Sequence, residues 1–212
     1  MSLQPQNRIY ISAILYSRMQ EMAYKRAKKT LPILLTREEI QKLLKRPNTK
    51  CYTGLRNAAI MHLMLFCGLR RSEICKLQTK EIDTAKMALR ITQGKGGKDR
   101  DLFIPESCRG ILNEWEKKRK GKDYFFSTCS GFRLQEVYIN QMIKTEGKKA
   151  GIEKRIYPHL LRHCYATEYY RSTKDIEGLR GILGHSDITT TTIYITLGAT
   201  DREEGMRAFK GY

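Results

Sequence analysis

The stretch "GLRNAAIMHLMLFCGLRRSEI", residues 54–74, decides the fold. Residues 54–68 are apolar on most faces, and a helix of that kind is expected inside a domain rather than on its surface. Gly68 predicts the end of this helix, because glycine adopts the left-handed conformation of a helix C-terminus without steric cost. A short helix over residues 72–78 should follow. The sequence therefore predicts one central buried helix.

Signals for the ends of helices recur along the chain. Thr36 can serve as an N-cap, and Glu39, three residues later, can complete a capping box. Pro158 stands at a favoured helix entry, and Gly184 at a favoured exit. Further helices are expected at residues 108–120, 134–151, 158–172, 174–184 and 201–209.

The apolar period changes from helical to alternating in two short segments, residues 87–93 and 100–104. Between them lies "GKGGKD", residues 94–99, a glycine-rich stretch with two lysines. This pattern predicts a β-hairpin with a basic tip, which Pro105 ends. The fold class expected from the whole sequence is mainly α with a small antiparallel β-sheet (α+β).

Charge is the strongest signal in the composition. The 212 residues include 40 Lys and Arg against 22 Asp and Glu, which gives a formal net charge of +18. Such an excess favours a polyanionic partner, and nucleic acid is the usual one because binding releases condensed counterions. An acidic membrane surface is the next candidate, but no basic amphipathic helix with a strong apolar face supports it.

The spacing of the cysteines indicates whether a metal site is present and which cellular compartment the chain suits. None of the six cysteines forms a C-x-x-C pair, so neither a zinc ribbon nor a thioredoxin-type site is indicated. The chain shows no signal-peptide core and no apolar run near 18 residues. We expect a reduced, cytoplasmic environment and no membrane association.

Several residues could carry chemistry, although each has an ordinary alternative. Arg70 follows a helix-ending glycine, and its planar fork matches two phosphate oxygens, but a surface arginine on a turn would look the same. Lys95 or Lys98 at the hairpin tip could contact DNA or donate a proton, or could simply be solvated. Tyr194 follows four threonines, and a packed aromatic residue is the plain interpretation.

Histidines offer a second group of candidates. His159 and Arg162 share one helical face. His159 and His163 have the spacing of a zinc pair, but the glutamate of H-E-x-x-H is missing and the intervening arginine would repel a cation. We therefore interpret His163 as a packed, structural histidine. His185 follows Gly184, where a lone histidine is usually a cap or a surface group.

Taken together, these side chains make up the inventory of a phosphoryl-transfer site that needs no metal. Two arginines can stabilise charge on the non-bridging oxygens, and a lysine and histidines can move protons. A tyrosine hydroxyl can attack phosphorus and form a covalent intermediate.

Four segments in this order, "GLRRSEI", "GKGGKDR", "PHLLRHCYAT" and "LGHSDITTTTIY", resemble the tyrosine recombinase (phage integrase, Xer-like) family. The pattern of that family is Arg, Lys, His-x-x-Arg, His or Trp, then Tyr. The intervals from Arg162 to His185, 23 positions, and from His185 to Tyr194, 9 positions, both suit it. The resemblance covers about residues 31–196 and implies the DNA breaking–rejoining fold.

The resemblance implies a role for each matching residue. Tyr194 would be the nucleophile that forms a 3′-phosphotyrosyl link, and Lys95, or else Lys98, would protonate the leaving 5′-oxygen. The other matching residues would be phosphate ligands (Arg70, Arg162 and His185), an acid or base (His159) and an orienting residue (Glu73). Contacts to DNA are expected from Lys95, Lys98, Arg100 and Arg71. Neither a metal ion nor ATP is implied, because the covalent link preserves the energy of the phosphodiester.

The resemblance also implies an organisation. Residues 1–30 would be a basic helical remnant of an N-terminal core-binding domain, and residues 31–212 a catalytic domain with a C-terminal tail helix. Partners would be double-stranded DNA with specific recombination sites and, on DNA, three further copies in a homotetramer, with a monomer off DNA. The family often has proline at the position of Phe103, so the second strand should run on to Pro105. A fragment of a longer integrase is favoured over a naturally short recombinase.

Two alternatives stay open at this point. A non-catalytic DNA-binding protein on the same fold would lack one or more site residues, and none is lost in this sequence. An RNA-binding module would fit the charge, but no RNA-recognition motif or aromatic stacking pattern supports it.

Overall fold

The computed structural model describes residues 33–92 and 99–184. The chain divides into two units, Met1–Pro32 and Ile33–Tyr212, and the described residues all belong to the second. Its elements, in chain order, are α2 (Arg37–Lys45), α3 (Tyr52–Phe66), α4 (Arg71–Lys76), the 3-10 turn η1 (Thr79–Glu81), β1 (Ile82–Asp83), β2 (Ala88–Ile91), β3 (Arg100–Phe103), the 3-10 turn η2 (Glu106–Cys108), α5 (Arg109–Lys118), α6 (Glu136–Lys149), α7 (Pro158–Thr173) and α8 (Ile176–Leu183).

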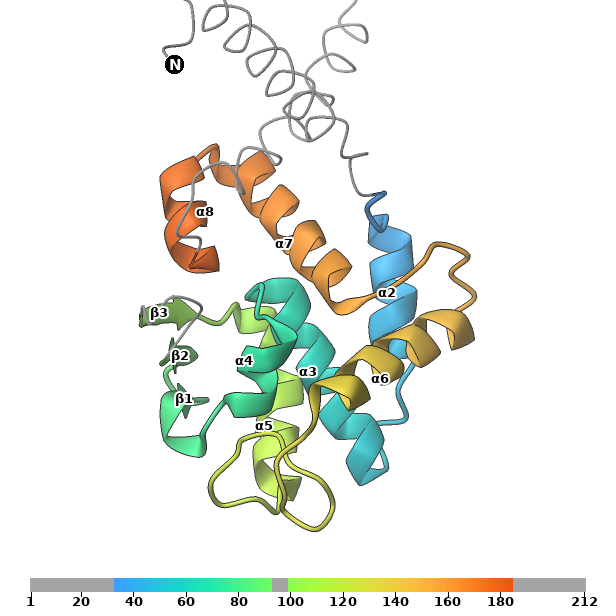
Figure 1. Ribbon diagram of the computed structural model, residues 1–212, viewed down its shortest axis with the longest axis vertical. Helices are drawn as coiled ribbons and strands as arrows, with labels where there is room; N and C mark the ends of the chain where they lie inside the picture. Colours follow the sequence, from blue (N-terminus) through green and yellow to red (C-terminus); the bar gives the residue numbers. More distant parts are fainter. Residues whose placement is uncertain (1–32, 93–98, 185–212) are drawn as a thin grey trace, which may run out of the picture. The chain divides into compact units, whose positions relative to one another are not determined.

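Helix α3 forms the centre of the packing, as residues 54–68 predicted (Figure 1). It contacts α2, α5 and α7, and most of its side chains are buried. The core around it includes Trp115 and the neighbouring pair Phe125 and Phe126, all fully buried. The indole N–H of Trp115 donates to the backbone oxygen of Phe125 at 3.0 Å, so the largest core side chain leaves no polar atom unpaired.

Helix α3 ends where glycine was expected. Gly68 has φ +65°, and a Cβ placed on it would lie 2.4 Å from Cδ1 of Tyr165. Both the left-handed backbone and the close ring therefore require glycine at this position. The chain can then turn sharply into α4, whose first residue, Arg71, lies only five positions after the end of α3.

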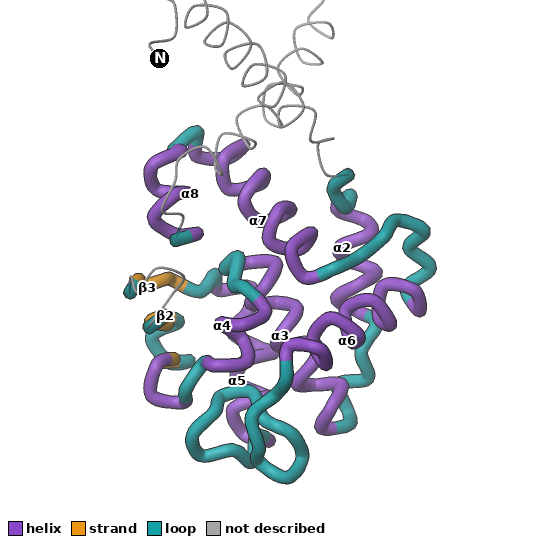
Figure 2. The backbone as a smooth tube through the Cα atoms, viewed as in Figure 1, coloured by secondary structure: helices purple, strands orange, loops and turns teal. Residues whose placement is uncertain are grey.

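A three-stranded antiparallel sheet with the order β1-β2-β3 lies beside the helices (Figure 2). Leu89 of β2 pairs with both Ile82 of β1 and Leu102 of β3, so these three apolar side chains share one face. Arg100 pairs with Ile91 and lies on the same face as Leu102, because side chains two apart on a strand point the same way. Helix α8 packs against β3.

Helices α7 and α8 form an adjoining pair. Pro158 occupies the first turn of α7, and Lys174, in the left-handed conformation, ends the helix. Asp175 caps α8 by accepting from the backbone N–H of Gly178 at 2.8 Å. Gly184, with φ +59°, ends α8.

The predicted fold class is confirmed, and four of the predicted helices begin and end within two residues of α5, α6, α7 and α8. The capping box is also confirmed, with Thr36 and Glu39 bonded in both directions. Strand β3 ends at Phe103, but the N–H of Ile104 still donates to Met87 at 2.7 Å, so pairing reaches the residue before Pro105. Strand β1 was not predicted. The segments expected to be helical within residues 1–30 and at 201–209 lie outside the described residues.

Across residues 33–92 and 99–184, none of the helices combines the length and the apolar character needed to cross a bilayer.

Candidate active site

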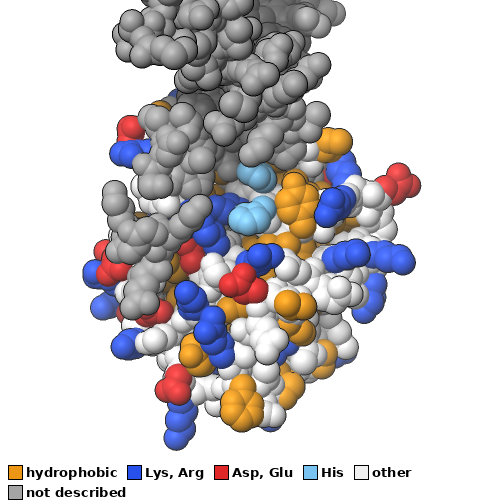
Figure 3. Space-filling view, in the orientation of Figure 1, with side chains coloured by type: hydrophobic (Ala, Val, Ile, Leu, Met, Phe, Trp, Pro, Cys, Tyr) orange, Lys and Arg blue, Asp and Glu red, His pale blue; other side chains and the backbone are white. Residues whose placement is uncertain are grey.

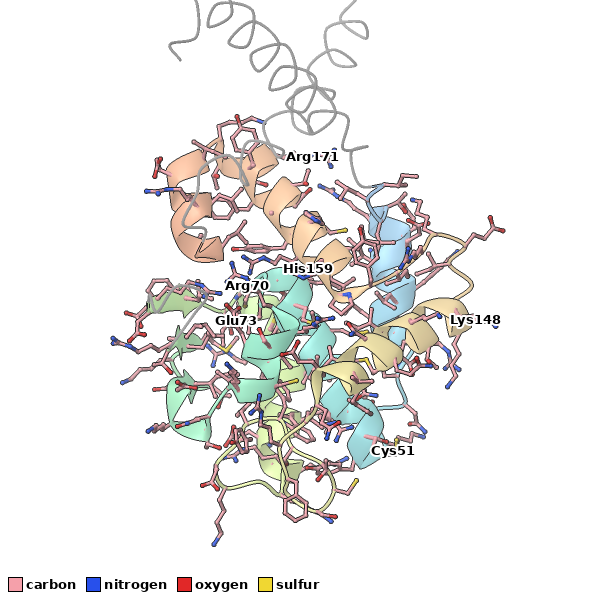
Figure 4. All side chains as sticks on the ribbon, in the orientation of Figure 1. Cys51, Arg70, Glu73, Lys148, His159 and Arg171 are labelled. Atoms are coloured by element: carbon pink, nitrogen blue, oxygen red, sulfur yellow. The ribbon has the colours of Figure 1, made fainter. Side chains whose placement is uncertain are left out.

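Glu73 is the centre of a buried charge cluster. It lies on α4, is 7% exposed, and binds two arginines at once. Arg100 donates from Nη1 to Oε1 at 2.9 Å and from Nη2 to Oε2 at 2.8 Å. Arg70 donates its backbone N–H to Oε2 at 2.8 Å and Nη1 to Oε1 at 2.9 Å. Figure 4 labels Arg70 and Glu73 side by side at the start of α4.

This carboxylate stays ionised. Burial alone would raise the pKa of Glu73, but the hydrogen bonds and charge of Arg100, the backbone N–H of Arg70 and the charge of Arg162 together lower it. The ionised form is required, because only a carboxylate can accept all four donors. Two guanidinium groups against one carboxylate leave the cluster with a net positive charge.

The C-terminal end of α8 accepts from three arginines of different elements. Arg100 donates from Nε to the carbonyl of Ile182 at 2.6 Å. Arg162 donates from Nη2 to Leu183 at 2.5 Å, and Arg70 donates from Nη2 to Gly184 at 3.2 Å. The last carbonyls of a helix have no partner within the helix and carry partial negative charge, so cations are favoured there. Three consecutive carbonyls thus gather three positive groups.

Local structure fixes the two arginines expected to bind phosphate. Arg70 is the N-cap residue of α4 and follows the turn at Gly68. Arg162 lies in the second turn of α7, is 4% exposed, and donates from Nη1 to the carbonyl of Gly68 at 2.6 Å. The turn at Gly68 therefore sets the position of Arg70 and also supplies the carbonyl that binds Arg162.

The histidines of α7 lie near this cluster. His159 is at the solvent-accessible start of the helix, and partial burial, followed by the charges of Arg162, Arg71 and Arg70, lowers its pKa. His163, one turn further on, is more deeply placed, and burial lowers its pKa to about 4. A neutral, largely enclosed imidazole agrees with the structural role expected for His163.

Not every expected site residue lies in this cluster. Arg71 donates to Glu136 at 2.8 Å and to Asn140 at 3.0 Å, so it joins α4 to α6. Arg100 was expected at the DNA surface, but its side chain is 8% exposed and its donors go to Glu73 and Ile182. Among the other candidates, Lys95, Lys98, His185 and Tyr194 lie outside the described residues.

A basic hollow of about 530 Å³ adjoins the cluster and was not expected from the sequence. Its lining includes His159 of α7 and Arg71 of α4, and Lys144 and Lys148 of α6. Arg155 also lines it and lies over the ring of Tyr157, with Cζ 6.0 Å from the ring centre. Figure 3 shows blue Lys and Arg side chains around the pale blue histidines on the face in view. The i, i+4 lysines of "KTEGK" were the available sequence signal.

Comparison with known proteins assigns the chain to a family. Residues 34–200 match the model of the phage integrase family. The chain belongs to the phage integrase family. Within this family a tyrosine recombinase of Thermosipho africanus is 29% identical over 202 residues, which cover 95% of this chain and 70% of that protein.

Other members are similar over a smaller share of their length. Tyrosine recombinase XerA of Pyrococcus furiosus is 34% identical over 84% of this chain and 62% of its own length. Tyrosine recombinase XerC of Xanthomonas campestris is 32% identical over 81% of this chain and 53% of its own length. The chain thus spans about half to 70% of the length of these phage integrase relatives.

Solved structures of recombinases share the fold. The crystal structure of XerA recombinase superposes with a TM-score of 0.74 at 31% identity, over 87% of this chain and 66% of that one. The crystal structure of XerH recombinase bound to its difH substrate superposes with a TM-score of 0.70 at 25% identity, over 86% of this chain and 54% of that one.

Proposed function

We propose that this chain is the catalytic part of a site-specific tyrosine recombinase, which cleaves and rejoins double-stranded DNA through a 3′-phosphotyrosyl intermediate. One observation carries the proposal. Arg70 and Arg162, far apart in the sequence, meet at the end of α8 together with the ionised Glu73. The relatives named as recombinases, one of them solved on its DNA substrate, support the same reaction class.

The two arginines would stabilise the transition state. Attack on a phosphodiester builds negative charge on the non-bridging oxygens, and preorganised guanidinium groups stabilise that charge most where water is excluded. Arg70 and Arg162 are already held by carbonyls and by Glu73, so they need little rearrangement when the phosphate arrives. His159, kept neutral by its lowered pKa, can accept or pass a proton at the edge of the cluster.

The remaining roles fall to residues outside the described ranges. Tyr194 Oη would attack phosphorus and form the Tyr–O–P bond, while the bond to the 5′-oxygen breaks. Lys95 would protonate that leaving oxygen, and His185 would donate to a non-bridging oxygen. Reversal of these steps, with a 5′-hydroxyl as the nucleophile, rejoins the strand without a further source of energy.

The charge distribution supports duplex DNA as the substrate. The hollow lined by Lys144, Lys148 and Arg155 adjoins the proposed phosphate site, and such groups fit the backbone on either side of the cleaved bond. We further propose a cytoplasmic enzyme that is a monomer alone and a homotetramer on DNA. Residues 1–30 would be the end of a core-binding domain, and 31–212 the catalytic domain.

Trapping the covalent intermediate tests the proposal. Duplexes selected for binding from a randomised pool would be nicked near their centre, so that the short fragment with the freed 5′-hydroxyl diffuses away, and then incubated with the protein. We expect an adduct that resists denaturants, that is lost in Tyr194→Phe and Arg162→Ala, and that maps to Tyr194 by peptide mass. A wild-type protein that binds these duplexes fully and forms no adduct would instead be a non-catalytic DNA-binding protein.

A further inference from the structure

The side chain of Arg100 is enclosed in the protein, whereas a side chain that contacts DNA is expected to be exposed. It begins β3, immediately after the hairpin tip and Asp99, and its side chain is only 8% exposed. All three of its donor nitrogens are used, two on Glu73 and one on the carbonyl of Ile182. Arg100 thus connects the sheet, α4 and α8 through one planar group.

The geometry of this contact sets the orientation of Glu73. A guanidinium that donates two parallel hydrogen bonds to a carboxylate fixes the carboxylate plane, which a point charge such as lysine cannot do. The same two oxygens then accept the backbone N–H and Nη1 of Arg70. All four of these hydrogen bonds have donor–acceptor distances of 2.8 or 2.9 Å. Arg100 therefore acts on Arg70 through Glu73.

We propose that Arg100 is a positioning residue for phosphate capture, which orients Arg70 through Glu73 and holds the end of α8 where the other arginines meet it. The proposal rests on the proposed recombinase function. It differs from a DNA-contact role, because the side chain is enclosed, and from a purely structural one, because its partner is the carboxylate that holds a phosphate ligand.

An alternative is that Arg100 positions the lysine of the hairpin tip, since it follows residues 93–98 directly. The two roles can be separated chemically. A substrate with sulfur in place of the bridging 5′-oxygen has a leaving group that needs no proton, so it bypasses a general acid. It still develops charge on the non-bridging oxygens, so it still depends on correctly placed arginines.

The test compares Arg100→Lys and Arg100→Gln with a matched control, Arg90→Lys. Arg90 is on the neighbouring strand, its side chain is 58% exposed, and it pairs with Asp99 and Asp101 at 3.4 and 3.9 Å. Adduct formation would be timed on the oxygen and sulfur substrates, beside DNA affinity and thermal midpoint. We expect Arg100→Lys to lower the rate of adduct formation equally on both substrates, by on the order of a hundredfold. Small misplacements near a reacting group reduce rates by that much. DNA affinity should change little, and Arg90→Lys should resemble wild type.

A second measurement does not depend on catalysis. Inorganic sulfate has the tetrahedral shape and anionic oxygens of a phosphate group, and its binding raises the thermal midpoint by mass action. Arg100→Lys and Arg100→Gln should each lose most of the sulfate-induced shift that wild type and Arg90→Lys show. If wild type forms no adduct while this loss is observed, the recombinase function fails and the positioning role stands. The proposal would be overturned if both Arg100 variants kept the full sulfate-induced rise in thermal midpoint, or if they formed the adduct at the wild-type rate. It would also be overturned if they were slow on the oxygen substrate but reached the wild-type rate on the sulfur substrate.

Discussion

At the scale of single residues, Gly68 shows how closely the backbone and the site depend on each other. Its φ of +65° lets the chain leave α3, and the ring of Tyr165 fills the space that a side chain would need. Its carbonyl also accepts from Arg162. A change at Gly68 therefore disturbs both the fold and the anchoring of Arg162.

Replacing Gly68 by alanine should cost more than replacing Gly151, which serves as a matched control. Both have positive φ, +65° and +69°, but a Cβ on Gly151 would meet nothing within 4 Å. We expect about 1 kcal/mol for Gly151→Ala from backbone strain alone, and about 3 kcal/mol for Gly68→Ala, where overpacking is added. Urea denaturation of the two variants measures the difference. Equal losses would show that the ring of Tyr165 moves aside freely.

The site was partly predictable at this scale. Arg70, Glu73 and Arg162 were named from motif order, and the structure brings the three together. Arg100 was expected among the DNA contacts, as the resemblance carried by "GKGGKDR" implied. The overlooked signal was strand alternation: Arg100 lies two positions from the buried Leu102, so it points toward the core. An inward arginine implies a buried acid, which the sequence alone does not locate.

At the scale of elements, the predictions succeeded where local chemistry decides the outcome. The capping box at Thr36, proline at the start of α7 and glycine after α8 each act within one turn of chain, so they are visible in the sequence. Strand β1 was missed because two residues cannot display alternation; it exists through pairing with β2. The meeting of β3 with the end of α8 likewise depends on contacts between distant segments.

The cap of α2 gives a prediction for an element. Thr36 Oγ1 accepts from the N–H of Glu39 at 3.2 Å, and Glu39 Oε2 accepts from the N–H of Thr36 at 2.7 Å. Thr36→Ala should lower the free energy of unfolding by about 1 kcal/mol, since one helix-end donor loses its partner. Thr36→Ser keeps the hydroxyl and should cost far less. Chemical denaturation compares them, and similar losses in both variants would locate the effect in packing rather than in the cap.

At the scale of the whole molecule, a net charge of +18 should govern how DNA binding responds to salt. Each lysine that neutralises a phosphate contributes about 0.9 to the slope of log affinity against log salt concentration. Lys148 stands on the basic hollow at the end of α6 (Figure 4), so Lys148→Ala should reduce that slope by about one.

The control is Lys86→Ala. Lys86 lies in the turn between β1 and β2, its side chain is 81% exposed, and its ammonium lies 3.7 Å from Asp83. Affinity measured by fluorescence anisotropy from 50 to about 300 mM salt should give this control the wild-type slope. A Lys148→Ala slope equal to that of wild type would exclude the hollow from the DNA interface.

The anchoring of three arginines at the end of α8 also has a consequence for synthesis of the chain. The bonds from Arg70 and Arg100 to these carbonyls span 114 and 82 positions of sequence, whereas the bond from Arg162 spans 21. Contacts of such long range form late and slowly, after loop-closure entropy has been overcome. A nascent chain that has not yet emerged beyond Gly184 has its guanidinium groups but lacks the carbonyls that gather them. Incomplete products of translation would therefore carry guanidinium groups that are not yet gathered, and these can bind polyanions only through charge.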